Sequence, residues 1–248
     1  MGFLDRFKKK DVALDPIDFS LIGVDMHSHL IPGIDDGSKS LEQTLVMLAK
    51  FESLGYKKVI TTPHIMSDVY LNTPDIILGG LEQVRNAAND LGLSISIEAA
   101  AEYYFDETLL ARLHANEELL TFGNNCVLFE FSFHAVPDRV EQLIFELKTR
   151  GYQPILAHFE RYLYYHGNPQ KASWFRDQGV WIQLNLNSLG GHYGPEVQRQ
   201  AEQIVKNNWV DLVGTDCHRI EHLMILEKNS KRPYFHKLLQ LNLQNKNL

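Results

Sequence analysis

Short apolar runs rich in β-branched residues recur along the chain, and a stretch with helical spacing follows each of them. Runs of this length predict buried strands, and the stretches between them predict helices. Alternation of this kind implies a parallel sheet with helices covering both faces. The predicted strands are 21–26, 58–62, 95–101, 127–131, 154–157, 180–186 and 210–215.

Capping and stop residues predict several helix boundaries. Ser40, with Gln43 three residues later, indicates the start of the first helix, and Gly55 indicates its end. The spacing predicts a buried face on this helix made of Leu41, Leu45, Leu48 and Phe51. Later helices are expected over 137–151, 169–179 and 195–208, each opened by a proline.

Seven strand-helix units without a nucleotide-binding fingerprint favour a closed barrel over an open doubly wound sheet. The 248 residues suit one such barrel, and no linker or repeat marks a second domain. We therefore predict a distorted seven-stranded (β/α)7 barrel of the TIM-like kind over residues 21–248, preceded by an N-terminal extension over residues 1–20.

Composition and charge limit which partners and which cellular compartment suit this chain. With 24 Lys and Arg against 31 Asp and Glu, the net charge of −7 has the wrong sign for gripping nucleic acid along a broad basic face. Two cysteines, Cys126 and Cys217, are too few for a disulfide framework and fit a reducing cytoplasm. No apolar run reaches the ~20 residues of a membrane span. Residues 1–10 are either a solvated terminus or a weak peripheral contact with anionic lipid.

Six of the seven predicted strands end in a side chain that can bind a metal, at the edge where barrels of this kind place their active sites. They are His27 and His29 after the first strand, His64 after the second, Glu102, Glu130 and His158 after the third to fifth, and Asp216 and His218 after the seventh. Without cations, these carboxylates and Asp36 of the first loop would repel one another in a partly dry site. The pattern predicts a metal centre.

The ligand types narrow the choice of metal. Imidazoles and carboxylates without a thiolate suit manganese, iron, zinc or cobalt, and so many histidines argue against calcium or magnesium alone. We expect manganese or iron first, and zinc or cobalt as alternatives. Cys217 lies between Asp216 and His218, but strand alternation turns its side chain away from theirs and into the core.

Charge balance suggests the substrate. Three divalent ions would outweigh the four carboxylates Asp36, Glu102, Glu130 and Asp216 by two charges, which suits a phosphate monoester dianion. Metal coordination brings the pKa of bound water to about 7, so a metal-bound hydroxide can attack the phosphorus directly. A cysteine nucleophile is excluded, because neither Cys126 nor Cys217 has an arginine six residues further on.

Six segments in series resemble the polymerase and histidinol phosphatase (PHP) superfamily. Within it, they are most similar to the bacterial metal-dependent protein-tyrosine phosphatases of capsule and exopolysaccharide operons, the CpsB/YwqE type. The segments are DMHSHLIPGIDDG (25–37), TTPH (61–64), EAAAEYY (98–104), LFEFS (128–132), AHFERY (157–162) and GTDCH (214–218). The resemblance implies a PHP-type barrel with a three-metal centre that hydrolyses phosphotyrosine on a protein substrate. The expected substrate is a bacterial tyrosine kinase.

The resemblance also implies ligand sets. His27, His29, Glu102 and Asp216 would hold one ion. Glu102 would bridge to a second ion held by Glu130 and His158, and Asp36, His64 and His218 would hold the third.

Arg161 matches the family's phosphate-binding arginine, and with Asp216 and His218 it completes the predicted catalytic set. The family's usual turn after the last ligand is replaced here by Arg219 and the three residues that follow it, so Arg219 is the nearest candidate for a second phosphate-binding arginine. Tyr103, Tyr104, Tyr162 and Tyr164 are either an aromatic wall for the substrate ring or packing residues.

The sequence disfavours one rival class of barrel and leaves two alternatives open. An amidohydrolase barrel also begins with a His-x-His pair, but it should carry a histidine on the sixth strand, where this chain has Asn185 and Asn187. Histidinol-phosphate phosphatase, or another small phosphomonoesterase, would use similar ligands. A metal-binding regulatory protein without turnover would preserve them as well.

Overall fold

The computed structural model describes residues 14–248, so the two interpretations of residues 1–10, a solvated terminus or a weak lipid contact, concern residues outside the described ones. Nine short strands are present in this part of the chain. They are β1 (Val24–Asp25), β2 (Lys58–Thr61), β3 (His64–Ile65), β4 (Ser96–Ala99), β5 (Glu102–Tyr104), β6 (Cys126–Glu130), β7 (Gln153–Leu156), β8 (Trp181–Asn185) and β9 (Leu212–Gly214). All neighbouring strands pair in parallel.

These nine strands make a seven-stranded barrel, because two of the predicted strands are interrupted. The β2–β4 pair has Thr61 opposite Ala99, and the β3–β5 pair resumes in the same register with His64 opposite Glu102. Pro63 lies in the gap, and it has no N–H to donate to a ladder. The barrel prediction is confirmed. The strands predicted at 21–26, 180–186 and 210–215 are shorter than expected, whereas β6 and β7 have the predicted length.

The first and last strands close the barrel. Ser28 and Cys217 form a parallel bridge, and the backbone N–H of Asp216 donates to the carbonyl of His27 at 2.8 Å. Asp25 is buried at the same seam, where its carboxylate accepts from the backbone N–H of Thr215 at 2.7 Å. Burial raises the pKa of Asp25 to about 7.

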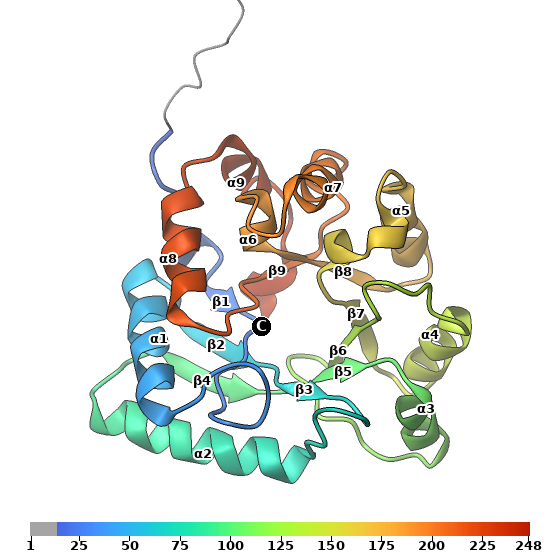
Figure 1. Ribbon diagram of the computed structural model, residues 1–248, viewed down its shortest axis with the longest axis horizontal. Coiled ribbons are helices and arrows are strands. Elements are labelled where there is room, and N and C mark those ends of the chain that lie inside the picture. Colours follow the sequence, from blue (N-terminus) through green and yellow to red (C-terminus); the bar gives the residue numbers. More distant parts are fainter. Residues whose placement is uncertain (1–13) are drawn as a thin grey trace, which may run out of the picture.

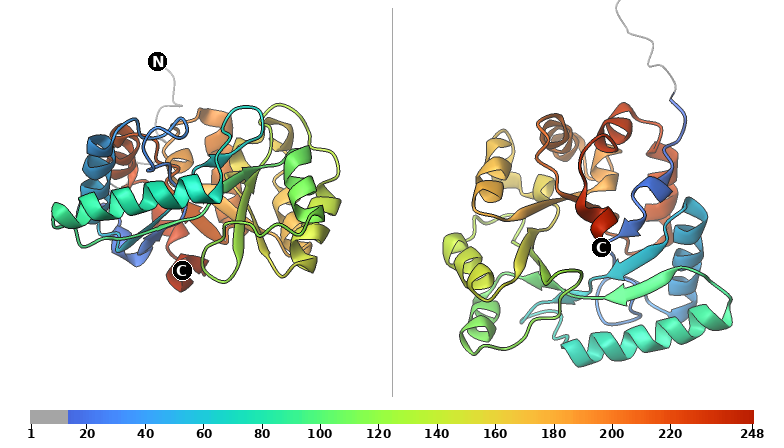
Figure 2. Two further views of the ribbon diagram at one scale, coloured as in Figure 1. Left: turned by 90° about the horizontal axis from the view of Figure 1, so that it is seen from below. Right: turned by 180° about the vertical axis from the view of Figure 1, so that it is seen from behind.

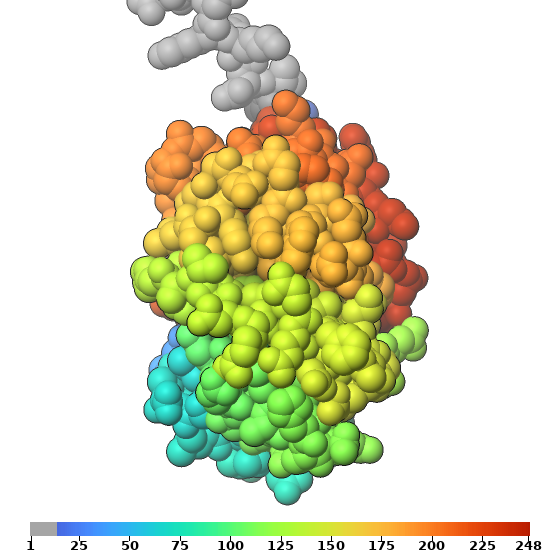
Figure 3. Space-filling model, turned by 90° about the vertical axis from the view of Figure 1, so that its right-hand side faces the viewer, coloured from blue at the N-terminus to red at the C-terminus, as the bar shows by residue number. Residues whose placement is uncertain are grey.

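Helices surround the strands, and successive units lie beside one another around the barrel (Figures 1 and 3). The α-helices are α1 (Leu41–Leu54), α2 (Pro74–Asp90), α3 (Glu107–His114), α4 (Val140–Thr149), α5 (Gln170–Asp177), α6 (Leu186–Leu189), α7 (Pro195–Lys206), α8 (Ile220–Asn229) and α9 (Pro233–Leu238). Four 3-10 turns are η1 (Phe19–Leu21), η2 (Phe159–Arg161), η3 (Leu163–Tyr165) and η4 (Gln244–Asn247). None of the helices in residues 14–248 is long and apolar enough to cross a membrane.

Helix α1 begins and ends where the capping residues predict. The Ser40 side chain accepts from the N–H of Gln43, and Gly55 ends the helix with φ of 102°. The buried face differs from the prediction: Leu41 and Leu45 are only partly buried, and Thr44 and Met47 are buried instead. Thr44 tolerates burial because its hydroxyl donates to the carbonyl of Leu30 at 2.8 Å.

The barrel has a packed interior, and the C-terminal segment closes the end at which the strands begin. Alternate strand residues such as Met26, Ile60 and Leu128 form an inner apolar cluster, separate from the larger one between strands and helices. Turn η4 lies under the barrel, where the Asn245 amide bonds to Val24 and Val213 (Figure 2). The opposite end, where the strands' carboxyl ends meet, is therefore the open one.

Two residues that precede position 21 pack into the apolar core. Ile17 is 6% exposed and Phe19 is 2% exposed, and both belong to the apolar cluster under the helices.

Candidate metal centre

The backbone turns sharply where two strands deliver their polar side chains. His158 follows β7 with φ of 32°, and Asp216 follows β9 with φ of 51°. This left-handed region is unusual for residues other than glycine, although Asp and His enter it more readily than most. Both side chains are thereby directed into the barrel mouth instead of continuing their strands.

Two glycines let the backbone approach the histidines closely. A Cβ on Gly214 would lie 2.5 Å from the Cβ of His27, and a Cβ on Gly37 would lie 2.3 Å from the carbonyl oxygen of His29. Both distances are shorter than atoms can tolerate. Glycine at these positions therefore allows β9 and the first loop to pack directly against the His-x-His pair.

Four buried side chains form the floor of the site: His27, Glu102, His158 and Asp216, none of them more than 4% exposed. Glu102 Oε2 lies 3.2 Å from His27 Nε2, and Glu102 Oε1 lies 3.0 Å from His158 Nε2. Asp216 Oδ1 lies 3.5 Å from His27 Nε2. One carboxylate therefore joins two imidazoles.

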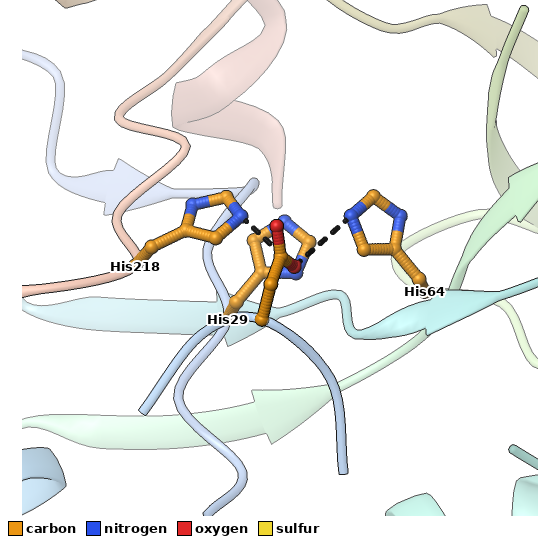
Figure 4. A group of neighbouring side chains, drawn as sticks. His29, His64 and His218 are labelled. Carbon is orange, nitrogen blue, oxygen red and sulfur yellow. Dashed lines mark ion pairs between the residues drawn. The ribbon is translucent and has the colours of Figure 1, made fainter. Parts of the chain in front are cut away.

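Three more exposed side chains form the rim: Asp36, His64 and His218, with 52%, 13% and 17% of their side chains exposed. The rings of His64 and His218 lie on either side of a carboxylate, with the ring of His29 behind it (Figure 4). Asp36 Oδ1 lies 3.5 Å from His64 Nε2 and 3.4 Å from His218 Nε2. The rim thus offers a second set of converging ligand atoms.

His29 and Glu130 connect the two layers. His29 Nε2 lies 3.3 Å from Asp216 Oδ1 in the floor, and its ring stacks on that of His218 in the rim. Glu130 Oε1 lies 3.1 Å from His64 Nδ1.

Ligand atoms converge in four overlapping groups, within each of which they lie within 4.8 Å of one another. The groups are His29, Asp36, His64 and His218; His27, His29 and Asp216; His27, Glu102 and His158; and His64, Glu102 and Glu130. Each predicted ligand belongs to at least one group. The grouping differs from the predicted one in three respects. His29 also reaches the rim group, His64 also reaches Glu102 and Glu130, and His158 is grouped with His27 and Glu102 instead of with Glu130.

Three further residues orient the ligands, and sequence reasoning missed them. Asp35 Oδ2 lies 2.8 Å from His29 Nδ1, and Gln183 Oε1 lies 3.0 Å from His27 Nδ1. These contacts leave each Nε2 free to face the site. Asn185 donates to Asp216 Oδ2 at 2.7 Å. The adjacent aspartates of the first loop were a signal for Asp35, whereas nothing local pointed to the two amides.

The electrostatics of the cluster show strong mutual attraction between its rings and carboxylates. Burial raises the pKa of Glu102, but His27 and His64 outweigh it and hold that pKa well below its usual value. Burial lowers the pKa of His158, yet Glu102 and Glu130 raise it to about 9. In the absence of cations, protons on the imidazoles therefore balance the buried carboxylates.

The residues fit a metal centre by a direct structural test. Within residues 14–248, the buried atoms Glu102 Oε2 and His64 Nδ1 make no hydrogen bond of good geometry, although they lie 3.2 Å from each other and face the converging groups. Buried polar atoms are rarely left without a partner, so these two atoms require one. Imidazole and carboxylate donors are the ligands that divalent transition metals prefer.

Arg161 lies beside the cluster in a fixed position. It donates from Nη1 to Asp216 Oδ2 at 2.8 Å, and its guanidinium lies 4.4 Å from the Phe133 ring centre and 4.5 Å from that of Tyr193. Two aromatic faces and one carboxylate thus hold the planar group at the edge of the site. Phe133 and Tyr193 were not expected from the sequence.

Arg219 also borders the cavity but is held loosely. Its side chain is 63% exposed, and its nearest acidic partner is Glu221 at 3.9 Å. Its place at the start of α8, directly after His218, leaves the guanidinium in solvent. The structure thus places the two predicted arginines in very different surroundings.

The expected tyrosines separate into lining and packing residues. Tyr104 lines the cavity above the cluster, which has a volume of about 630 Å³. Tyr103 and Tyr162 are buried, and their hydroxyls accept from the backbone N–H groups of Leu120 and Phe131. Tyr164 donates to the carbonyl of Ser132, so these three are packing residues. Tyr70 and Tyr193 line the cavity instead.

The fold and the clustered ligands define a class: α/β barrel proteins with a polynuclear metal centre at the carboxyl ends of the strands. The family model for capsular polysaccharide synthesis proteins, CpsB/CapC, matches residues 23–235. The chain belongs to this family, and the resemblance seen in the sequence is confirmed.

Relatives within this class carry informative names. The chain is 28% identical to the tyrosine-protein phosphatase YwqE of Bacillus subtilis, over 85% of this chain and 87% of that protein. It is 25% identical to the tyrosine-protein phosphatase CpsB of Streptococcus pneumoniae, over 80% of this chain and 84% of that one.

Solved structures agree on the fold. A structure described with YwqE from Bacillus subtilis and CpsB from Streptococcus pneumoniae as "unique metal-dependent tyrosine phosphatases" superposes with a TM-score of 0.76 at 26% identity, over 90% of this chain and 94% of that one. A lactonase from Listeria monocytogenes matches with a TM-score of 0.55 at 13% identity, over 93% of this chain and 95% of that one. The second likeness concerns the barrel alone.

Proposed function

We propose that this protein hydrolyses phosphotyrosine on protein substrates with the help of three divalent cations. The observation that carries the proposal is the cluster of converging imidazoles and carboxylates at the bottom of an open cavity, with a fixed arginine at its edge. The activities named for the relatives support the choice of phosphotyrosine.

The nine predicted ligands would hold the cations. His27, His29, Glu102 and Asp216 would take one ion, Glu102, Glu130 and His158 a second, and Asp36, His64 and His218 the third. The overlapping groups also allow His29 to be a ligand of the third ion and His64 to be a ligand of the second. We propose manganese or iron as the metal, with zinc or cobalt as alternatives, because the donors are nitrogen and oxygen without sulfur.

The protein's own groups would position the phosphate. Bound cations would lower the pKa of water, so that hydroxide would be available as the nucleophile at neutral pH. Arg161 would hold the phosphate oxygens, since its side chain is clamped by Phe133 and Tyr193 and retains donors beyond the one given to Asp216. Asp216 would have two roles, as a metal ligand and as a positioning partner of Arg161, because Oδ1 faces the histidines while Oδ2 accepts from Arg161. His218 at the rim completes the proposed catalytic set.

Arg219 would make a looser contact with the substrate. Its exposed guanidinium at the cavity edge can move to meet a phosphate or a peptide carbonyl. We expect its contribution to be smaller than that of Arg161, because ordering an exposed side chain costs conformational entropy.

We propose that the physiological substrate is a bacterial tyrosine kinase that controls capsule or exopolysaccharide synthesis in the cytoplasm. Membership of the capsular polysaccharide synthesis family supports this setting. Both cysteines, Cys126 and Cys217, are unpaired and buried, as suits a reducing compartment.

A side-by-side assay tests the proposal. With manganese added, the rates on a phosphotyrosine peptide and on histidinol phosphate are compared at equal concentrations. We expect faster turnover of the peptide and loss of activity in excess chelator. Faster turnover of histidinol phosphate would reverse the choice of substrate, and activity that survives chelation would remove the metals from the proposal.

A further inference from the structure

A second, smaller hollow adjoins the metal cavity. It has a volume of about 280 Å³ and lies between β3, the loop that follows it and helix α3. Met66, Tyr70 and Tyr104 line both hollows, so the two share a wall. A substrate seated over the metal cluster would therefore have this hollow directly beside it. We call it the Leu71 groove, after the most exposed of its apolar residues.

The wall between the two hollows is a fixed hairpin. Met66 and Tyr70 exchange backbone hydrogen bonds of 3.0 Å in both directions. The Ser67 hydroxyl donates to the Asp106 carboxylate at 2.6 Å, which ties the hairpin to the start of α3. The Tyr70 ring stacks on the ring of His64 with 5.4 Å between centres. The groove thus exists before any substrate arrives, and it is built onto a predicted metal ligand.

The lining of the groove is mainly apolar, with one cation that is available to a ligand. Ile65, Leu71, Tyr103 and Leu109 line it, and Leu71 is 74% exposed. Both carboxylate oxygens of Asp106 are engaged, one by Ser67 and the other by the N–H of Leu109.

Arg112 supplies that cation. Among residues 14–248, the acidic partner of its guanidinium is Glu117, at 3.7 Å, and 24% of its side chain is exposed. The groove therefore matches an apolar side chain with a negative group close to it.

We propose that the Leu71 groove is a subsite for the polypeptide flanking the phosphotyrosine, taking an apolar side chain next to it and a nearby carboxylate at Arg112. This inference rests on the proposed function and specifies its substrate class. Free phosphotyrosine and other small monoesters have nothing that reaches the groove. A peptide buries Leu71 and gains affinity, so the groove selects proteins over small phosphate esters.

Matched peptides and variants test the groove. Leu71→Asp places a charge in the apolar wall, and Leu91→Asp is the control, because Leu91 is also exposed (58%) but lies at the far end of α2. The substrates are a phosphotyrosine peptide with apolar flanking residues, the same peptide with glycines in their place, and p-nitrophenyl phosphate, all with manganese-loaded protein.

The expected result is a selective loss. Leu71→Asp should lower kcat/KM for the apolar peptide about 10-fold or more, through KM, and leave the glycine peptide and p-nitrophenyl phosphate nearly unchanged. Leu91→Asp should change none of the three. An equal loss on all three substrates, or no loss on any, would overturn the subsite.

Direct binding separates this inference from the proposed function. Fluorescence anisotropy of the labelled apolar peptide should show weaker binding to Leu71→Asp than to Leu91→Asp, even if turnover of phosphotyrosine is absent. Equal binding to both variants would overturn the subsite while leaving any measured phosphatase activity standing. If Leu71→Asp instead converts an oligomer into a monomer in light scattering, the groove joins copies of this chain and the inference is wrong.

Discussion

The floor and the rim of the cluster differ in how firmly the chain holds them. The floor residues His27 and Asp216 are buried: His27 Nδ1 donates to the side-chain oxygen of Gln183, and Asp216 accepts from the side-chain amide of Asn185, both on β8. In the rim, Asp36 stands on a loop with half of its side chain in solvent.

The difference indicates two kinds of metal site in one cavity. Removal of one ligand lowers metal affinity more at a buried site with oriented ligands, because water cannot solvate the charges that remain. A rim site can recruit water in place of a missing side chain. We therefore expect floor ions to be structural as well as catalytic, and the rim ion to exchange more readily.

The largest effect should come from removing a floor ligand. His27→Ala should lower kcat at least about 1,000-fold, beyond the 10–100-fold typical of residues that only orient ligands, and most of the bound metal should be lost with it. Metal analysis of the purified protein, alongside turnover, measures both.

The matched rim variant sharpens the contrast. His218→Ala should lose about one ion and keep the others. If both variants lost the same number of ions, the distinction between floor and rim would be wrong.

The next effect should separate phosphate binding from metal binding. Arg161→Ala should reduce kcat by about 100- to 1,000-fold, because a charge-assisted donor to the transition state is lost. Its metal content should stay that of the unsubstituted protein. Full activity in Arg161→Ala would withdraw the phosphate role, and a loss of metal would make it a structural partner of Asp216.

A smaller effect should follow from the amide that supports the floor. Gln183→Leu should weaken metal binding about 10- to 100-fold, because His27 loses the partner that orients its ring. Gln200→Leu is the matched control, since Gln200 is also buried but, among the described residues, its amide donates to the carbonyl of Tyr165 and not to a metal ligand. Competition with a chelator of known affinity measures the change, and equal weakening in both variants would count against an orienting role.

The last effect concerns the stability of the metal-free protein at different pH. The folded pKa of His158 is raised to about 9 from an ordinary value near 6.5. Protonated His158 therefore stabilises the folded, metal-free protein by up to about 3 kcal/mol. This stabilisation is fully present below pH 6.5 and is lost as pH rises through 9.

Melting temperatures in excess chelator should therefore fall between pH 6.5 and 9. Manganese-loaded protein should not show the fall, because cations bind neutral imidazoles and gain affinity as pH rises. The same slope with and without metal would contradict this account.

Several features could be read from the chain because they are local. The cap at Ser40 and the stop at Gly55 depend on neighbouring residues, and both appear in the structure as expected. The ligands could be located because they follow apolar runs, and parallel strands bring their carboxyl ends together. The interruption of the second and third strands was not expected, since the break at Pro63 shows only once the paired register is known.

The sequence by itself determined the alternating architecture and the set of residues at the barrel mouth. Only the tertiary structure decided which groups support them: Gln183 is 156 residues from His27, and Arg161 is 55 residues from Asp216. The same holds for the clamp around Arg161 and for the Leu71 groove. The physical reason is that periodicity encodes which way a side chain points within its own element, whereas its partner depends on how distant elements pack.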